Sequence, residues 1–371
     1  MQILVINSGS SSLKFRLLNS SKNYELIAKG LIEKIGLRRS KVRDHKEALK
    51  LCLESLEGKQ IDAVGHRVVH GGEKFTEPTK ITPRVIREIK RLSHLAPLHN
   101  PANLQGILAC KKILKRTPQV AVFDTAFHQT MPDHAYLYGL PEKLYKKHAI
   151  RRYGFHGTSH KYVCNEALKL LRTKKAKIIT CHLGNGSSIT ATINGKSIDT
   201  SMGLTPLEGI MMGTRSGSID PAIIIYLQKK LKLTPQKVDH LLNNESGLKG
   251  FSGISSDMRK IYQKSLKGNS RALLTIRTLS YQISKYLGAY FAAMQGVDAV
   301  VFTGGMGEKA FYIRAQAILG LASIKAKIDP RKNRKNELKI HHKDSKIKVF
   351  VIPTNEEKQI AIETHDLLAK I

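Results

Sequence analysis

Tryptophan is absent from this 371-residue sequence, cysteine occurs four times, and acidic residues number only 29. The absence of tryptophan carries no functional message. The cysteines, at positions 52, 110, 164 and 181, form no CxxC pair, and their spacing fits neither a disulfide framework nor a zinc site. We therefore expect reduced thiols, as in a cytoplasmic protein.

Long hydrophobic runs are also missing. Apolar stretches such as Ala222–Leu227 are far shorter than the roughly 20 residues of a membrane-spanning helix, so no membrane partner is expected. The apolar run Ile3–Ile6 turns polar at once, whereas a secretory signal needs a basic start and a longer apolar stretch. Export is therefore not expected.

The scarcity of acidic residues leaves a large positive charge. Lys and Arg together number 62, and the formal net charge is +33 at pH 7. Such a charge suggests nucleic acid, an anionic membrane surface or acidic ligands, and composition alone does not choose among them. With 41% hydrophobic and 25% charged residues the chain has the composition of a globular protein, and its length predicts two domains.

Two segments share one pattern, at residues 3–18 and 178–193. Each has a short apolar run, a polar turn and then a stretch in which apolar residues alternate. The turns carry Gly-Ser-Ser at the same place, residues 9–11 and 186–188. Two strand–turn–strand units of this kind, far apart in the chain, predict a duplicated fold.

Other segments predict helices and a further strand. Apolar residues recur at helical spacing over 163–171 and 279–294, and Val297–Thr303 is a buried-strand candidate. Alternating strands and helices indicate the α/β class. Lys325–Lys348 is rich in Lys and Arg and poor in apolar residues, so we expect a solvated loop or exposed surface element there.

Three turns combine the small and polar residues that suit phosphate: Asn7–Ser12, Gly184–Ser188 and Gly304–Glu308. Glycine lets the backbone approach an anion, and N–H groups in a turn or at a helix N-terminus donate to it. Neither G-x-x-x-x-G-K-[ST] nor a strand followed by G-x-G-x-x-G occurs. These turns therefore favour a duplicated fold that clamps a nucleotide between two halves.

Several segments are unusually dense in His, Arg and Asp. They are residues 65–72, 94–101, 122–128, 151–160 and 212–217. Arginine beside Gly and Thr suits a planar anion clamp, although arginines in so basic a chain are also common as solvated surface charges. His156 and His160 lie four residues apart, but no third metal ligand is evident nearby, so structural hydrogen bonds are expected of them.

Six blocks resemble the signature blocks of the acetate kinase family. They are Asn7–Phe15, Phe123–His128, Tyr153–His160, His182–Ser188, Met212–Gly217 and Asn355–Glu357. The blocks are long and ordered, and the resemblance runs from Ile3 to the C-terminal segment, nearly the whole chain.

The resemblance implies an α/β fold of two duplicated RNase H-like halves, shared with sugar kinases, heat-shock chaperone ATPases and actin, with a nucleotide cleft between them. The implied N-terminal domain comprises residues 1–124 plus 357–371, closed by the C-terminal helix. The implied C-terminal domain comprises residues 125–356 and serves nucleotide binding and dimerisation.

The activity that the resemblance implies is reversible phosphoryl transfer from ATP to acetate, giving ADP and acetyl phosphate. It further implies Mg²⁺, with Mn²⁺ as a substitute, and a cytoplasmic homodimer without a membrane or specific nucleic-acid partner. One alternative is a short-chain acyl kinase that prefers propionate or butyrate. Another is a basic nucleic-acid-binding protein on the same fold, although no RNA or DNA motif is visible.

The resemblance also implies four catalytic residues. Arg67 and Arg215 match arginines at the substrate carboxylate and the migrating phosphoryl group, and His156 matches a residue that stabilises transition-state oxygens. Asp124 is often given a proton-transfer role in the family. Because a carboxylate substrate is already ionised at neutral pH, we expect Asp124 to orient Mg²⁺, water or an arginine instead.

Binding residues are implied in the same way. Arg67, Val69, Leu98 and Pro206 would bind the substrate, and a metal would lie near Asn7 and Glu356. The ATP-binding residues would be Lys14, His182, Leu183, Gly184, Asn185, Gly186, Asp257, Met258, Arg259, Gly305, Met306, Gly307, Glu308 and Lys309.

The sequence departs from the family pattern at two positions near these blocks. Lys309 stands where the family usually has Asn, which affects an adenosine-side contact. Ser218 replaces the usual Asp, which removes a charge just after Arg215. The segment from about Asn19 to Gln60 is also shorter than usual, and we expect its shortening to affect only peripheral elements.

Overall fold

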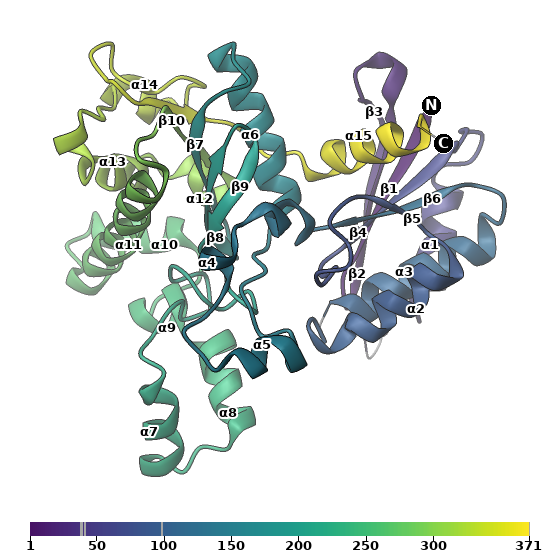
Figure 1. Ribbon diagram of the computed structural model, residues 1–371, viewed down its shortest axis with the longest axis horizontal. Helices are drawn as coiled ribbons and strands as arrows, with labels where there is room; N and C mark the ends of the chain where they lie inside the picture. The colour runs from purple at the N-terminus through teal and green to yellow at the C-terminus, as the bar shows by residue number, and fades with distance from the viewer. Residues whose placement is uncertain (38–39, 41, 98, 371) are drawn as a thin grey trace. The chain divides into compact units, whose positions relative to one another are not determined.

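The computed structural model describes residues 1–37, 40, 42–97 and 99–370, and its contacts divide the chain into two units (Figure 1). The first unit comprises Met1–Gln129, Phe155–Tyr162 and Asn355–Ile371; the second comprises Thr130–Gly154 and Val163–Thr354. Within the described ranges, no helix is both long and apolar enough to cross a membrane.

A six-stranded sheet forms the first unit, in the order β3-β2-β1-β4-β6-β5. Its strands are β1 (Gln2–Ser8), β2 (Ser12–Asn19), β3 (Glu25–Glu33), β4 (Ala63–Val68), β5 (Thr79–Lys80) and β6 (Gln119–Phe123). The first three strands pair antiparallel, whereas β1, β4 and β6 run parallel. The predicted strand–turn–strand over residues 3–18 is confirmed.

Helices cover both faces of this sheet (Figure 1). They are α1 (His45–Glu54), α2 (Pro83–Arg91), α3 (Asn100–Ile113) and α15 (Glu356–Leu368), with short 3-10 turns η1 (Ser20–Lys22), η2 (Leu92–His94) and η3 (Ala126–Thr130). Side chains alternate along β1, so Ile3 and Val5 pack with Ile360 of α15, while Leu4 and Ile6 face the cluster of α1 and α3.

The second unit repeats this design. Its sheet has the order β11-β10-β7-β8-β9, in which β7, β8 and β9 pair antiparallel while β7, β10 and β11 run parallel. The strands are β7 (Lys177–Leu183), β8 (Ser187–Ile193), β9 (Lys196–Thr200), β10 (Ala299–Thr303) and β11 (Lys348–Val351). Taken from the other edge, the order β9-β8-β7-β10-β11 corresponds to β3-β2-β1-β4-β6 in the first sheet. The predicted duplication of an RNase H-like half is therefore confirmed.

The long helix predicted over residues 279–294 is part of α11 (Ser270–Met294), which begins earlier because the Asn269 side chain accepts from the Ala272 N–H and caps it. The helix predicted over 163–171 is the end of α6 (Gly157–Leu171). The remaining helices are α4 (Asp133–Tyr136), α5 (Glu142–His148), α7 (Ala222–Lys230), α8 (Pro235–His240), η4 (Leu241–Glu245), α9 (Gly247–Ser252), α10 (Met258–Ser265), α12 (Gly304–Lys309), α13 (Phe311–Leu319), η5 (Ala322–Ile324) and α14 (Pro330–Arg334).

The basic segment Lys325–Lys348 corrects one expectation. It was predicted to be a solvated loop or exposed element, yet it contains α14, and Ile340 and Ile347 are buried in the core of the second unit. The backbone of Ile340 pairs with that of Val349, which draws two isolated apolar residues inward while the lysines remain at the surface. Periodicity could not show this, because the apolar residues are too few to form a pattern.

Candidate active site

The parallel strands of the first unit bring polar side chains to one edge of its sheet. Asn7 lies at the end of β1, Arg67 at the end of β4, and Asp124 directly after β6. The register pairs Ile6 with His66 and Arg67 with Val122, so these strand ends are level. Carboxyl ends of parallel strands are where α/β folds place their ligands.

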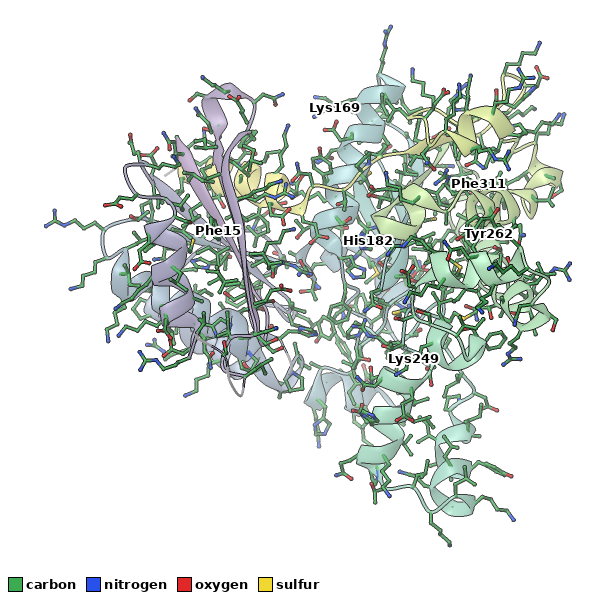
Figure 2. All side chains as sticks on the ribbon, turned by 180° about the vertical axis from the view of Figure 1, so that it is seen from behind. Phe15, Lys169, His182, Lys249, Tyr262 and Phe311 are labelled. Atoms are coloured by element: carbon green, nitrogen blue, oxygen red, sulfur yellow. The ribbon has the colours of Figure 1, made fainter. Side chains whose placement is uncertain are left out.

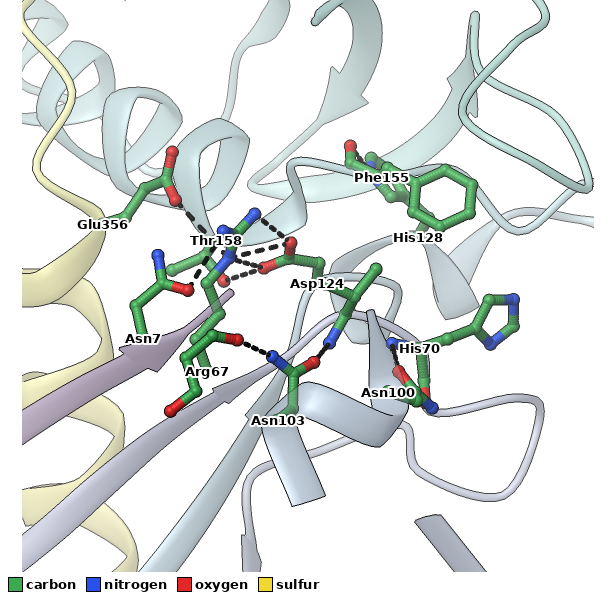
Figure 3. A network of polar contacts seen from close by, with 12 residues as sticks. Asn7, Arg67, His70, Asn100, Asn103, Asp124, His128, Phe155, Thr158 and Glu356 are labelled. Carbon is green, nitrogen blue, oxygen red and sulfur yellow. Dashed lines mark hydrogen bonds and ion pairs between the residues drawn. The ribbon is translucent and has the colours of Figure 1, made fainter. Parts of the chain in front are cut away.

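Arg67 and Asp124 form a bidentate ion pair at this edge (Figure 3). Arg67 Nη2 donates to Asp124 Oδ2 at 2.6 Å, and Nε lies 3.0 and 3.2 Å from the two carboxylate oxygens. Thr158 Oγ1 donates to Oδ1 at 3.2 Å. Burial opposes the charge on Arg67, but Asp124 and Glu356 outweigh it and hold the pKa of Arg67 above its ordinary value.

Two further side-chain oxygen atoms lie near the Arg67 guanidinium. Its Nη1 is 3.5 Å from Asn7 Oδ1, and its Nε is 3.7 Å from Glu356 Oε2, at the start of α15. Burial, with the nearby charges of Asp124 and Glu357, raises the pKa of Glu356 despite the attraction of Arg67. The predicted metal residues Asn7 and Glu356 therefore both contact Arg67.

The N-terminus of α15 is fixed by β2. Asn355 Oδ1 accepts from the Lys358 N–H and from Arg16 Nη1, while Glu357 forms an ion pair with Lys14. Burial alone would raise the pKa of Glu357, but the Lys14 ammonium outweighs it and the pKa lies below its ordinary value. Lys14, predicted on the ATP side, is thus engaged with a carboxylate that was not assigned a role.

Two asparagines of α3 hold the loop that follows β4 (Figure 3). Asn103 Oδ1 accepts from the Val69 N–H at 3.0 Å, and its Nδ2 donates to the Ser8 carbonyl at 2.7 Å. Asn100 Oδ1 likewise accepts from the His70 N–H, and its Nδ2 donates to the His70 carbonyl. The predicted substrate residue Val69 is therefore rigidly placed beside the end of β1, whereas Leu98 lies outside the described residues.

His156 adopts an unusual backbone conformation, with φ of 57°, directly before α6. Its carbonyl accepts from the His160 N–H, and the Gly157 N–H donates to the Asp124 carbonyl at 3.0 Å. A Cβ at residue 157 would lie 2.1 Å from that carbonyl oxygen, so only glycine fits. Strained backbone of this kind costs energy and concentrates at functional sites.

In the second unit, the predicted catalytic residue Arg215 lies beside Pro206, which was predicted to bind the substrate. Its Nη1 donates to the Pro206 carbonyl at 3.1 Å, and burial lowers its pKa. In the part of the chain that the structure describes, no carboxylate lies within ion-pair distance of Arg215. A half-buried guanidinium without an ion-pair partner among the described residues is suited to an external anion.

The block around Arg215 packs on the glycine turn after β7. The Gly213 N–H donates to the Asn185 carbonyl at 3.0 Å, and Ser187 Oγ bonds both backbone groups of Gly184. Of the other residues predicted here, His182 and Leu183 end β7, with the Leu183 side chain in the core. A further constraint was missed: a Cβ on Gly247 would clash with the backbone of Met212 and Arg215.

A pocket of about 780 Å³ lies in the second unit next to this turn. Its lining includes eight of the predicted ATP-binding residues: Gly184, Asn185, Asp257, Met258, Arg259, Gly305, Met306 and Lys309. Gly186, Gly307 and Glu308 do not line it; Gly307 is buried, and Glu308 Oε1 accepts from the Gly304 N–H. We call this cavity the aromatic pocket, because of the three rings described next.

Tyr262, Phe311 and Tyr312 form one wall of the aromatic pocket. The rings of Tyr262 and Tyr312 are stacked with centroids 3.7 Å apart, and the Phe311 ring meets Tyr262 edge-on at 5.9 Å. Figure 2 shows Tyr262 and Phe311 beside one another. None of the three was predicted from the sequence, although Phe311 and Tyr312 lie two and three residues after Lys309, the last residue of the glycine block.

The two departures from the family pattern have distinct surroundings. Lys309 is exposed and lines the aromatic pocket. Ser218 Oγ accepts from the Gly209 N–H at 3.0 Å, and the Ser218 N–H donates to the Gly209 carbonyl, which closes the loop that contains Arg215. Serine at this position therefore supports the loop without a charge.

Comparison with known proteins gives consistent matches over the whole chain. A model of the Acetokinase family matches residues 2–362. The chain is 51% identical to the acetate kinase of Halothermothrix orenii (98% of each chain) and 51% identical to that of Caldanaerobacter subterraneus subsp. tengcongensis (100% of each). Among solved structures it resembles Porphyromonas gingivalis acetate kinase (TM-score 0.95, 43% identity, 99% of each chain) and a propionate kinase from Francisella tularensis subsp. tularensis SCHU S4 (TM-score 0.93, 44% identity, 98% and 99%).

Proposed function

The chain belongs to the acetokinase family, and from that premise we propose that it is an acetate kinase, transferring phosphate reversibly from ATP to acetate to give ADP and acetyl phosphate. The observation that carries this proposal is the buried Arg67–Asp124 pair at the carboxyl ends of parallel strands. It places a fixed cationic fork where a carboxylate ligand would bind.

Arg67 binds the acetate carboxylate, and Asp124 acts as its positioning residue. The Nε and Nη2 atoms of Arg67 face Asp124, so the carboxylate holds the guanidinium in one orientation. The acetate methyl group contacts the side chain of Val69. No base is required, because acetate is already ionised at neutral pH.

Arg215 and His156 stabilise the charge that develops on the migrating phosphoryl group. Phosphoryl transfer depends on positioning and charge neutralisation more than on covalent chemistry. Arg215 is suited to this role by its half-buried guanidinium, and His156 by its place between Asp124 and α6.

ATP binds in the aromatic pocket of the second unit. Its base stacks against the wall of Tyr262, Phe311 and Tyr312, and its phosphates meet the N–H groups of the Gly184–Ser188 turn. The volume of about 780 Å³ is within the range of pockets for ligands of this size. Lys14 is also expected to bind phosphate.

Asn7 and Glu356 would hold Mg²⁺, or Mn²⁺ in its place. Their oxygen atoms suit a hard cation. Burial raises the pKa of Glu356, so a bound cation would stabilise its charged form. When bound, the ion neutralises phosphate charge. Among the described residues, no group of three or more His, Cys, Asp or Glu side chains could hold a metal ion.

The proposal extends to a cytoplasmic homodimer, with domains at residues 1–124 plus 357–371 and 125–356. Support for dimerisation comes from large apolar side chains exposed on α7 and α11 of the second unit. Ile225, Tyr226 and Tyr281 are 50%, 60% and 66% exposed. Exposed apolar surface of this kind marks interaction sites.

One coupled assay tests the proposed reaction. Purified protein is given ATP, Mg²⁺ and acetate, propionate or butyrate, and ADP release is followed. Acetate should give the highest kcat/KM, but one methylene in an apolar pocket changes binding by only about 1–3 kcal/mol, so propionate should also react. A preference for propionate or butyrate would favour the acyl-kinase alternative. No turnover with all three acids, together with tight and salt-sensitive nucleic-acid binding, would overturn the proposal.

A further inference from the structure

A second pocket of the second unit has no role in the proposed reaction. It has a volume of about 700 Å³ and lies among α13, α14 and the segment that joins them. Its apolar lining includes Phe311, Ile318 and Ile328, and its basic lining includes Lys327, Arg331 and Arg334. We call it the basic-rimmed pocket.

The apolar lining extends from the core to the surface, where the basic side chains lie. Ile318 is 2% exposed and belongs to the core, whereas Leu319 is 71% exposed and the three basic side chains are exposed. The described lining contains neither Asp nor Glu. An apolar floor gains free energy by covering an alkyl or aryl group, and a cationic rim gains it by pairing with an anionic head.

This combination selects one chemical class. Inorganic phosphate would leave the apolar floor in water, and a neutral hydrophobe would leave the rim unpaired. A molecule with an apolar body and a single anionic head satisfies both. Arg334 already lies over the Phe311 ring, 5.4 Å from its centroid, so the head group and the apolar body would meet at that contact.

The basic-rimmed pocket shares a wall with the aromatic pocket, because Phe311 lines both. A fully buried arginine makes a second connection. Arg314 Nη1 donates to the Gly307 carbonyl of α12 at 2.7 Å, and its Nε and Nη2 bond Asn333 at 2.8 and 2.7 Å. Asn333 lines the basic-rimmed pocket, and α12 carries residues of the aromatic pocket.

We propose that the basic-rimmed pocket binds an amphiphilic carboxylate with a medium-length alkyl chain, and that this tightens ATP binding in the aromatic pocket. A bound carboxylate restricts the motion of Phe311 and α13. ATP then loses less conformational entropy when it binds the aromatic pocket, because part of the wall of that pocket is already ordered. The binding step stands on the pocket alone. The coupling step rests on the proposed function, which places ATP in the aromatic pocket.

Decanoate is the probe for the binding step, measured by isothermal titration calorimetry on the intact protein. The double variant R331E/R334E should weaken decanoate binding by about tenfold or more, since it reverses the rim charge. K339E removes a lysine of the same basic segment that does not line the pocket, and should bind as the wild type does. Equal binding by the double variant, equal binding of decanol, or loss of decanoate binding in R67A would overturn the site.

The coupling step is tested by measuring the Kd of ATP with and without saturating decanoate. Decanoate should lower this Kd by about fivefold, and ATP should tighten decanoate binding by the same factor. The effect should vanish in R331E/R334E. If ATP and decanoate both bind and neither changes the other's Kd, the coupling is wrong. If ATP does not bind at all, the proposed function fails, whereas decanoate binding still judges the pocket.

Discussion

Arg67 Nη2 and Asp124 Oδ2 lie 2.6 Å apart, joining neighbouring parallel strands at their carboxyl ends. Asp124 is 1% exposed, and its carboxylate accepts from Arg67 and from Thr158. The pair therefore fixes the orientation of the guanidinium, and this orientation determines how a ligand of Arg67 is positioned.

Replacing Asp124 by Asn tests this dependence. The variant keeps the shape of the side chain but removes the charge that orients Arg67, so we expect kcat to fall about 100-fold, as misplaced catalytic groups do. Breaking a buried ion pair should also lower the free energy of unfolding, by up to about 3 kcal/mol. Steady-state kinetics and urea unfolding measure the two effects. D133N changes an exposed carboxylate and is the matched control; wild-type kcat in D124N would contradict the positioning role.

R67A and R215A should each lower kcat by about 1,000-fold. R67A removes the cation that positions the acetate carboxylate, and R215A removes a cation from the developing negative charge. Circular dichroism should remain that of the folded protein. R67K keeps the charge but loses the planar fork, so it should recover only part of the activity. R84A, at an exposed position of α2, serves as control. Near-normal acetyl phosphate formation by R67A or R215A would rule out the assignment of that residue.

Tyr312 offers a test of the aromatic pocket. Y312A removes a stacking surface, and base–aromatic stacking is worth about 1–3 kcal/mol, so the KM for ATP should rise about tenfold while the KM for acetate stays unchanged. Y312F keeps the ring and loses only the hydroxyl, which donates to the Met258 carbonyl at 3.4 Å. It should therefore behave as the wild type does. A KM for ATP that is unaffected in Y312A would place the base elsewhere.

The metal proposal predicts a change in cation requirement. E356Q should raise the Mg²⁺ concentration at half-maximal activity by about 10- to 100-fold, because an amide is a weaker ligand than a carboxylate. D366N removes an exposed carboxylate from the same helix and should leave the requirement unchanged. Titrating Mg²⁺ at fixed ATP distinguishes the two variants, and equal curves would exclude Glu356 as a ligand.

Local patterns in the sequence predicted much of the fold. The strand–turn–strand units at 3–18 and 178–193 were predictable because apolar residues alternate around a glycine turn in each. This pattern involves only residues that are close in sequence. The start of α11 was missed, since its first turn depends on the Asn269 cap rather than on apolar periodicity. Ile340 was missed because one apolar residue in a basic segment carries no pattern.

The candidate site was harder to predict from residues alone. The family resemblance implied roles for Arg67 and Asp124, but their ion pair arises from strand register, which joins positions 57 apart in sequence. Tyr262 and Tyr312 stack from separate helices, and each alone resembles an ordinary core aromatic. Arg314 gave no signal, because nothing local distinguishes a buried arginine from an exposed one.

The buried histidine of β4 makes stability depend on pH. His66 is 2% exposed and bonds Gln119 Oε1 at 3.0 Å, and burial lowers its pKa from 6.5 to about 4. Above pH 6.5 neither the folded nor the unfolded chain protonates this ring. As the pH falls from 6.5 towards 4, the unfolded chain binds a proton that the folded chain excludes, so this site lowers the free energy of unfolding by up to about 1.4 kcal/mol per pH unit.

Urea unfolding between about pH 7 and about pH 5 measures that slope. H66Q removes the titrating ring from this buried position, so its free energy of unfolding should fall less steeply with acid than that of the wild type, whatever its stability at neutral pH. H134Q replaces an exposed histidine and should keep the wild-type slope. The comparison is between the slopes of the free energy of unfolding against pH. A destabilisation of H66Q that is the same at every pH would therefore not produce the expected result. Parallel curves for H66Q and the wild type would mean that His66 is protonated equally in the folded and unfolded chains.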